Sequence, residues 1–242
     1  GEYFGDSAKE IVYLDQNWDR YDSLWFYNTT QGSDLIPYSI FLNLEQENNT
    51  ELLRSAANMQ KLRFLNQRPS FDNPDGLPVG FVKDSYQGKD YMGFTCAACH
   101  TNQINYADVG MRIDGAPALS DIESLLVSIT ASIKATLADQ DKLDRLTVAV
   151  LAEGDAENEQ VFKQELAAVL AERQRYDRRN SPVHPGNNNI NVPYGYGRLD
   201  AFGRIYNRIL GHLVEPEVDN YNPANAPVSY PFLWDSPYSD FV

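Results

Sequence analysis

The chain has 242 residues, with 34 acidic against 20 basic side chains and a formal net charge of −14 at pH 7. This charge argues against nucleic acid or an anionic membrane as a partner, because phosphate groups would be repelled. No apolar run approaches the roughly 20 residues that span a bilayer. The hydrophobic content of 43% is that of a globular protein with a full core.

The spacing of apolar residues predicts a mostly α-helical chain, and a proline at position 37 suits the first turn of one helix. Segments 81–91 and 103–113 are instead expected to be extended. The first has a turn at residues 87–88, and the second forms a small hairpin. The predicted helices lie around residues 18–25, 37–44, 50–65, 91–101, 120–137, 141–153, 158–178 and 199–210.

Residues 96–100 read Cys-Ala-Ala-Cys-His, the C-x-x-C-H attachment signature of c-type haem. Two thiols three residues apart lie on neighbouring faces of a helical turn, where they can form thioether bonds to the two vinyl edges of one porphyrin. The imidazole of His100 then lies under the iron as its proximal ligand. The chain has no other cysteine. The sequence therefore predicts one covalent haem c, held by Cys96, Cys99 and His100 on a haem helix over residues 91–101.

Two other interpretations of the cysteine pair stay open at this point. A redox dithiol of the thioredoxin type needs a βαβ context, which the flanking sequence lacks. A structural zinc site needs four ligands, and the sequence has no second Cys pair or His pair at zinc spacing. Haem c is the interpretation that we carry forward.

The sixth ligand of the iron decides between electron transfer and oxygen or peroxide chemistry. The downstream candidates are Met111, His184 and His212. A distal side that is open or holds water is the remaining possibility. Arg112 is a candidate partner for a haem propionate, because guanidinium groups pair well with carboxylates. A solvated surface position is the alternative for this arginine.

The C-terminal part of the sequence is irregular. Residues 180–197 form a long loop with three consecutive asparagines around position 188, so we consider a calcium ion there, although a plain turn-rich loop is the simpler interpretation. Residues 213–242 are rich in proline and lack periodicity. We therefore expect a cytochrome c-like haem domain with an N-terminal helical extension over residues 1–212, and an irregular tail or linker over residues 213–242.

Several stretches resemble the di-haem cytochrome c peroxidase superfamily. They are Gly-Leu-Pro-Val-Gly-Phe at 76–81, Ile-Asp-Gly-Ala-Pro at 113–117 and Arg-Leu-Asp-Ala-Phe-Gly-Arg at 198–204. The branch that the chain is most similar to is the bacterial rubber oxygenases, which the opening Tyr-Leu-Asp-Gln at 13–16, Phe-Tyr at 26–27 and Gln-Gly-Ser at 31–33 also resemble.

The resemblance implies a mostly helical fold with a haem c in each of two cytochrome-like domains. It further implies that His100 is the proximal ligand, that the distal side is open and holds oxygen, and that Phe202 is the distal phenylalanine. This chain carries one C-x-x-C-H motif where the two-haem members carry two. We therefore expect either the N-terminal haem half of a larger protein or a mono-haem relative.

Three functional hypotheses follow. The first is an exported c-type cytochrome domain that moves electrons for a redox partner protein or for a missing second haem domain. The second is a haem-dependent dioxygenase or peroxidase, whose substrate would be an apolar polymer or lipid if the oxygenase resemblance holds. The third is a haem-bearing module that docks to a larger extracellular enzyme through its tail. Because haem c is attached outside the cytoplasm, all three predict a periplasmic or secreted protein whose export signal has been removed.

Overall fold

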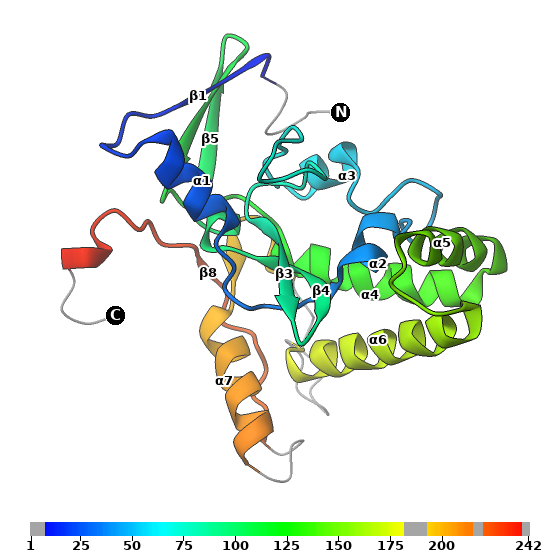
Figure 1. The fold of residues 1–242 in the computed structure, drawn as a ribbon. Helices are drawn as coiled ribbons and strands as arrows, with labels where there is room; N and C mark the ends of the chain where they lie inside the picture. The colour runs from blue at the N-terminus through cyan, green and yellow to red at the C-terminus, as the bar shows by residue number, and fades with distance from the viewer. Residues whose placement is uncertain (1–7, 182–192, 215–219, 239–242) are drawn as a thin grey trace.

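The computed structural model describes residues 8–181, 193–214 and 220–238. It is a mixed α/β fold with 43% helix and 17% strand, and its described residues form seven α-helices and three small sheets. The prediction of a mostly α, cytochrome c-like helical domain with a haem helix is therefore wrong. Figure 1 shows helices α4, α5 and α6 gathered on one side of the molecule and a long β-hairpin on the other.

The helical layer holds most of the core. Helix α2 (Tyr38–Asn43) packs on α5 (Gln140–Glu153), and α4 (Ile122–Ala138) packs on both α5 and α6 (Glu159–Arg179). The three longest helices confirm the sequence-based prediction, because their apolar residues recur on one face and that face is buried. The fully buried side chains that they contribute to the core include Leu125, Ile129, Ile133, Phe162 and Leu166.

The predicted haem helix over residues 91–101 is not formed, because residues 91–94 belong to a strand of the first sheet. Strands β3 (Phe81–Tyr86) and β4 (Lys89–Phe94) pair antiparallel around a turn whose two residues, Gln87 and Gly88, both have the positive φ angles that a tight hairpin needs. The short strand β2 (Ile36–Pro37) adds to β4. Six residues of β4 are thus committed to pairing with β3, and only η1 (Cys96–Ala98) is left to form a single helical turn.

The second sheet contains the predicted hairpin, which is confirmed. Strands β5 (Thr101–Tyr106) and β6 (Val109–Asp114) pair antiparallel, and β1 (Glu10–Tyr13) adds to β6 in parallel. Strand β5 begins directly after His100. This hairpin therefore starts and ends beside the C-x-x-C-H segment.

The remaining elements lie at the two ends of the chain. Helix α1 (Arg20–Asn28) lies near η1, and α3 is a short helix over Ala56–Lys61, where the sequence predicted one from 50 to 65. In the C-terminal part, helix α7 is preceded by a strand that pairs with the tail. These elements are β7 (Arg198–Leu199), α7 (Ala201–Leu213), β8 (Val228–Ser229) and η3 (Ser236–Tyr238).

Within the described residues, no helix combines the length and the apolar character that crossing a membrane requires.

Candidate functional site

The C-x-x-C-H segment is a single tight turn closed by its own backbone. The side-chain oxygen of Thr95 accepts a hydrogen bond from the amide of Ala97 and so caps the turn. The carbonyl of Cys96 accepts the amides of Cys99 at 3.2 Å and of His100 at 3.0 Å. Both cysteines and the histidine are therefore held within one turn.

The inner face of this turn packs against the molecule through two alanines. Ala97 and Ala98 are buried, whereas Cys96 is exposed. Gly80 lies directly beneath Ala98 with a φ of +83°, and a Cβ at this position would lie 2.1 Å from the amide nitrogen of Ala98. Only glycine allows this close approach of two backbones. The turn therefore presents Cys96 outward and its alanines inward, whereas Cys99 is partly buried against the core.

The loop between β6 and α4 holds the other end of the turn. The amide of Gly115 donates to the carbonyl of His100 at 2.8 Å, and the amide of Ala118 donates to the carbonyl of Cys99 at 2.9 Å. The hydroxyl of Ser120 donates to the carbonyl of Ala98 at 2.8 Å. Three successive carbonyls of the C-x-x-C-H segment are thus satisfied by residues 115–120, the stretch that begins within the Ile-Asp-Gly-Ala-Pro motif.

The tail orients the imidazole of His100. The Nδ1 atom of His100 lies 2.9 Å from the carbonyl oxygen of Pro231, which can only accept, so Nδ1 carries the proton and donates. The Nε2 atom then has the free lone pair. Burial lowers the pKa of His100, which favours the neutral ring. A neutral imidazole with one nitrogen held by a carbonyl is the arrangement of a metal-ligating histidine.

The two thiols have different surroundings. Neither is in a disulfide, and burial raises the pKa of Cys99 to about 12, although a hydrogen bond from Tyr230 opposes this shift. A redox dithiol of the thioredoxin type needs a βαβ unit around the motif. The strands flanking the motif pair antiparallel and form no βαβ unit around it. Two free thiols and an oriented imidazole on one turn fit the attachment of haem c.

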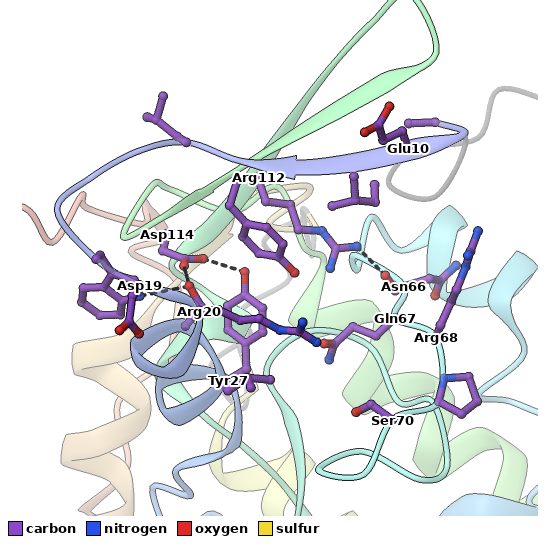
Figure 2. A pocket seen from close by; sticks show the side chains of 18 of the residues that line it. Glu10, Asp19, Arg20, Tyr27, Asn66, Gln67, Arg68, Ser70, Arg112 and Asp114 are labelled. Carbon is purple, nitrogen blue, oxygen red and sulfur yellow. Dashed lines mark hydrogen bonds between the residues drawn. The ribbon is translucent and has the colours of Figure 1, made fainter.

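The structure separates Arg112 from this turn. Arg112 is 3% exposed, and its guanidinium donates from Nε to the side-chain oxygen of Gln103 at 2.9 Å and from Nη2 to the carbonyl of Asn66 at 2.5 Å. Arg112 lines a cavity of about 780 Å³ that neither cysteine nor His100 lines (Figure 2).

The candidate distal residues are placed as follows. Met111 is partly exposed on β6 opposite Ile104, three positions along the hairpin from Thr101, which corresponds to about 10 Å of strand. Phe202 is 71% exposed in the first turn of α7. His184 and the three asparagines around residue 188 lie outside the described residues, and so does the side chain of His212. In the described part of the chain, no group of three or more His, Cys, Asp or Glu side chains could hold a metal ion.

Sequence reasoning missed a buried polar cluster next to the C-x-x-C-H turn. Asp114 accepts hydrogen bonds from the hydroxyls of Ser23 at 2.7 Å and Tyr27 at 2.6 Å. Tyr27 also packs against Ala97. The aspartate lies within the Ile-Asp-Gly-Ala-Pro motif, which was the available signal, but its partners are about 90 residues away in the sequence.

Comparison with known proteins identified one relative among the curated proteins. The chain is 30% identical over 258 residues to the uncharacterized protein y4iJ of Sinorhizobium fredii, in an alignment that covers 96% of this chain. The chain spans 41% of the length of that protein. No protein-family model and no solved structure matches the chain.

Proposed function

We propose that this chain is an exported c-type cytochrome domain that binds one haem c covalently and transfers electrons. The observation that carries the proposal is the C-x-x-C-H turn, in which both thiols are free and the Nδ1 atom of His100 is held by the carbonyl of Pro231. In this proposal Cys96 and Cys99 hold the porphyrin edges, and Nε2 of His100 is the proximal ligand. Bound haem supplies reversible one-electron chemistry.

The residues around the turn orient the groups that hold the haem. Because the Pro231 carbonyl binds the Nδ1 proton, the imidazole keeps one tautomer and one ring orientation, and its basicity at Nε2 rises. The amides of Gly115 and Ala118 hold the backbone of His100 and Cys99. A turn held at both ends costs little further entropy when it binds a cofactor.

The charge of the chain and the length of its relative suggest two kinds of redox partner. The net charge of −14 favours association with a basic protein, because opposite charges raise the rate of encounter. Since y4iJ is more than twice as long as this chain, a second domain of the same polypeptide is the other candidate partner.

The first test is an absorption spectrum of the exported chain, oxidised, reduced, and reduced with carbon monoxide. We expect haem that stays with the polypeptide after denaturation and a reduced spectrum that carbon monoxide does not change. The matched control is Cys96→Ser with Cys99→Ser, which should contain no covalent haem. A wild-type chain without covalent haem after export in a host that matures c-type cytochromes would overturn the proposal.

A second candidate function is a haem-dependent oxygenase or peroxidase, as the resemblance to rubber oxygenases implies. This function requires that Met111, which lies about 10 Å of strand from the residue after His100, leaves the sixth position of the iron open. Carbon monoxide binding to the reduced protein would support this function over electron transfer. Phe202→Ala should then change carbon monoxide affinity, and an unchanged affinity would remove Phe202 from the distal side.

A further inference from the structure

The cavity beside α1 has the size of a small-molecule site. Its volume of about 780 Å³ falls within the roughly 300–1,000 Å³ of ligand pockets. It lies between β1, α1, residues 66–70 and the end of β6 (Figure 2). The C-x-x-C-H residues do not line it, so it is separate from the proposed haem-attachment site.

Three carboxylates line this cavity, those of Glu10, Asp19 and Asp114, and the buried Asp114 already has its donors. Asp114 accepts the hydroxyls of both Ser23 and Tyr27, and the pKa of Tyr27 is strongly raised, first by burial and then by the charge of Asp114. The phenol therefore stays protonated and keeps donating. A ligand is not needed to satisfy Asp114, and a cation would have to compete with two short hydrogen bonds.

The three arginines that line the cavity differ in burial and in their partners. The buried Arg112 donates hydrogen bonds to the side chain of Gln103 and to the carbonyl of Asn66. Arg20 on α1 and Arg68 in the loop line the same cavity and are exposed, and in the described part of the chain they make no hydrogen bond or ion pair. Figure 2 shows Arg20 extending from α1 toward Gln67, with Arg68 beyond it. Three guanidinium groups thus line this cavity together with the carboxylates of Glu10, Asp19 and Asp114, and of these arginines the exposed Arg20 and Arg68 are the two without a partner in the described part of the chain.

Apolar side chains line the same space. Tyr13, Leu14 and Trp18 are 51%, 39% and 43% exposed, although each is large and apolar. The indole nitrogen of Trp18 donates to the hydroxyl of Ser23 at 3.0 Å, which fixes the ring at the cavity. An apolar wall beside several guanidinium groups matches a ligand with an apolar body and an anionic end, because guanidinium binds carboxylates through paired hydrogen bonds.

We propose that this cavity binds an amphipathic organic carboxylate. Its carboxylate lies among Arg20, Arg68 and Arg112, and its apolar body lies against the wall formed by Tyr13, Leu14 and Trp18. The site does not depend on the proposed haem function, because it shares no residue with the C-x-x-C-H turn.

The first experiment compares two probes of equal chain length on the full chain by calorimetry. Octanoate has the carboxylate, and 1-octanol has the same apolar body without the charge. We expect octanoate to bind at least tenfold more tightly than 1-octanol. Absence of octanoate binding at millimolar concentration, or equal binding of the two probes, would overturn the proposal.

The second experiment tests the arginines. Arg20→Gln combined with Arg68→Gln should weaken octanoate binding about tenfold and leave 1-octanol binding unchanged, because two charge-assisted contacts are lost. These exposed residues have no partners in the described structure, so the variant should fold. Arg208→Gln on α7 is the matched control, since it removes one exposed arginine that does not line the cavity. An octanoate affinity equal to wild type in the double variant would contradict the assignment.

Discussion

The C-x-x-C-H turn, where we propose that haem is attached, and the arginine-lined cavity are built in opposite ways, although they meet at the end of β6. The turn consists of five consecutive residues whose backbone is bound by the residues that follow β6. The cavity is assembled from side chains of β1, α1, the loop at 66–70 and β6. Asp114 lines the cavity, and the next residue, Gly115, donates its amide to His100.

The turn and the cavity therefore depend on different kinds of interaction. The turn depends on close backbone packing, so changes of shape beneath it should matter most. The cavity depends on side-chain charge and on hydrogen bonds to one carboxylate, so changes of chemistry at constant shape should matter most. Four substitutions test this contrast, with expected effects that decrease from the first to the last.

The largest effect is expected for His100→Ala. Removing the imidazole takes away the only ring nitrogen on the turn, so native iron ligation should be lost while the thioether bonds to Cys96 and Cys99 keep the haem attached. The absorption spectrum of the reduced protein measures this loss. His184→Ala and His212→Ala are informative companions, because a changed spectrum in either would identify the sixth ligand. A wild-type spectrum in His100→Ala would show that another group is the proximal ligand.

Gly80→Ala should be the most damaging change beneath the turn. The new methyl group would lie 2.1 Å from the amide nitrogen of Ala98, in a residue with a φ of +83°. Strain and overlap together should cost about 3 kcal/mol or more, with less haem incorporated. Gly88→Ala is the control, because its φ is +78° and a Cβ there would meet nothing within 4 Å. It should cost about 1 kcal/mol, from strain alone. Equal urea midpoints for the two variants would contradict the close approach.

Tyr27→Phe tests the hydrogen bond that the Tyr27 hydroxyl donates to the carboxylate of Asp114 in the cavity. The change keeps the ring against Ala97 and removes one of the two hydroxyls that donate to Asp114. Loss of a hydrogen bond to a buried carboxylate should lower the free energy of unfolding by about 2 kcal/mol, measured in urea, while haem content stays the same. Tyr21→Phe, an exposed tyrosine of the same helix, should leave stability unchanged. A drop in haem content with Tyr27→Phe would mean that the two regions are coupled.

Tyr230→Phe should have the smallest effect. Its hydroxyl donates to the carbonyl of Ser120 at 3.3 Å and also contacts Cys99. Removing this long hydrogen bond should cost about 1 kcal/mol in urea, and the ring that packs near His100 stays in place. Tyr238→Phe in the exposed tail end is the control. A loss of covalent haem in Tyr230→Phe alone would give the hydroxyl a part in attachment rather than in packing.

Local sequence patterns were sufficient for the long helices, for the hairpin of β5 and β6, and for the turn at residues 87–88. Helices α4, α5 and α6 bury one apolar face each, so a period of 3.6 residues determines both their existence and their approximate bounds. The turns at Gln87-Gly88 and Ala107-Asp108 have the positive φ angles that close two-residue hairpins. The segment before the C-x-x-C-H motif was predicted as a helix, but it forms β4, which pairs with β3 across the two-residue turn and with the distant β2. Pairing with β2 depends on residues more than 50 positions away, which periodicity within the segment does not report.

The sequence by itself determined the C-x-x-C-H motif, because the chemistry that it predicts needs only five consecutive residues. It also determined the helical layer, since amphipathic periodicity is a local property. Only the tertiary structure decided that the motif occupies one turn, that Pro231 orients His100, and that Arg112 lines a cavity with Arg20 and Arg68. The last two arrangements bring together residues 44 to 131 positions apart in the chain, and long-range arrangements of this kind are selected by packing of the whole fold rather than by any local preference.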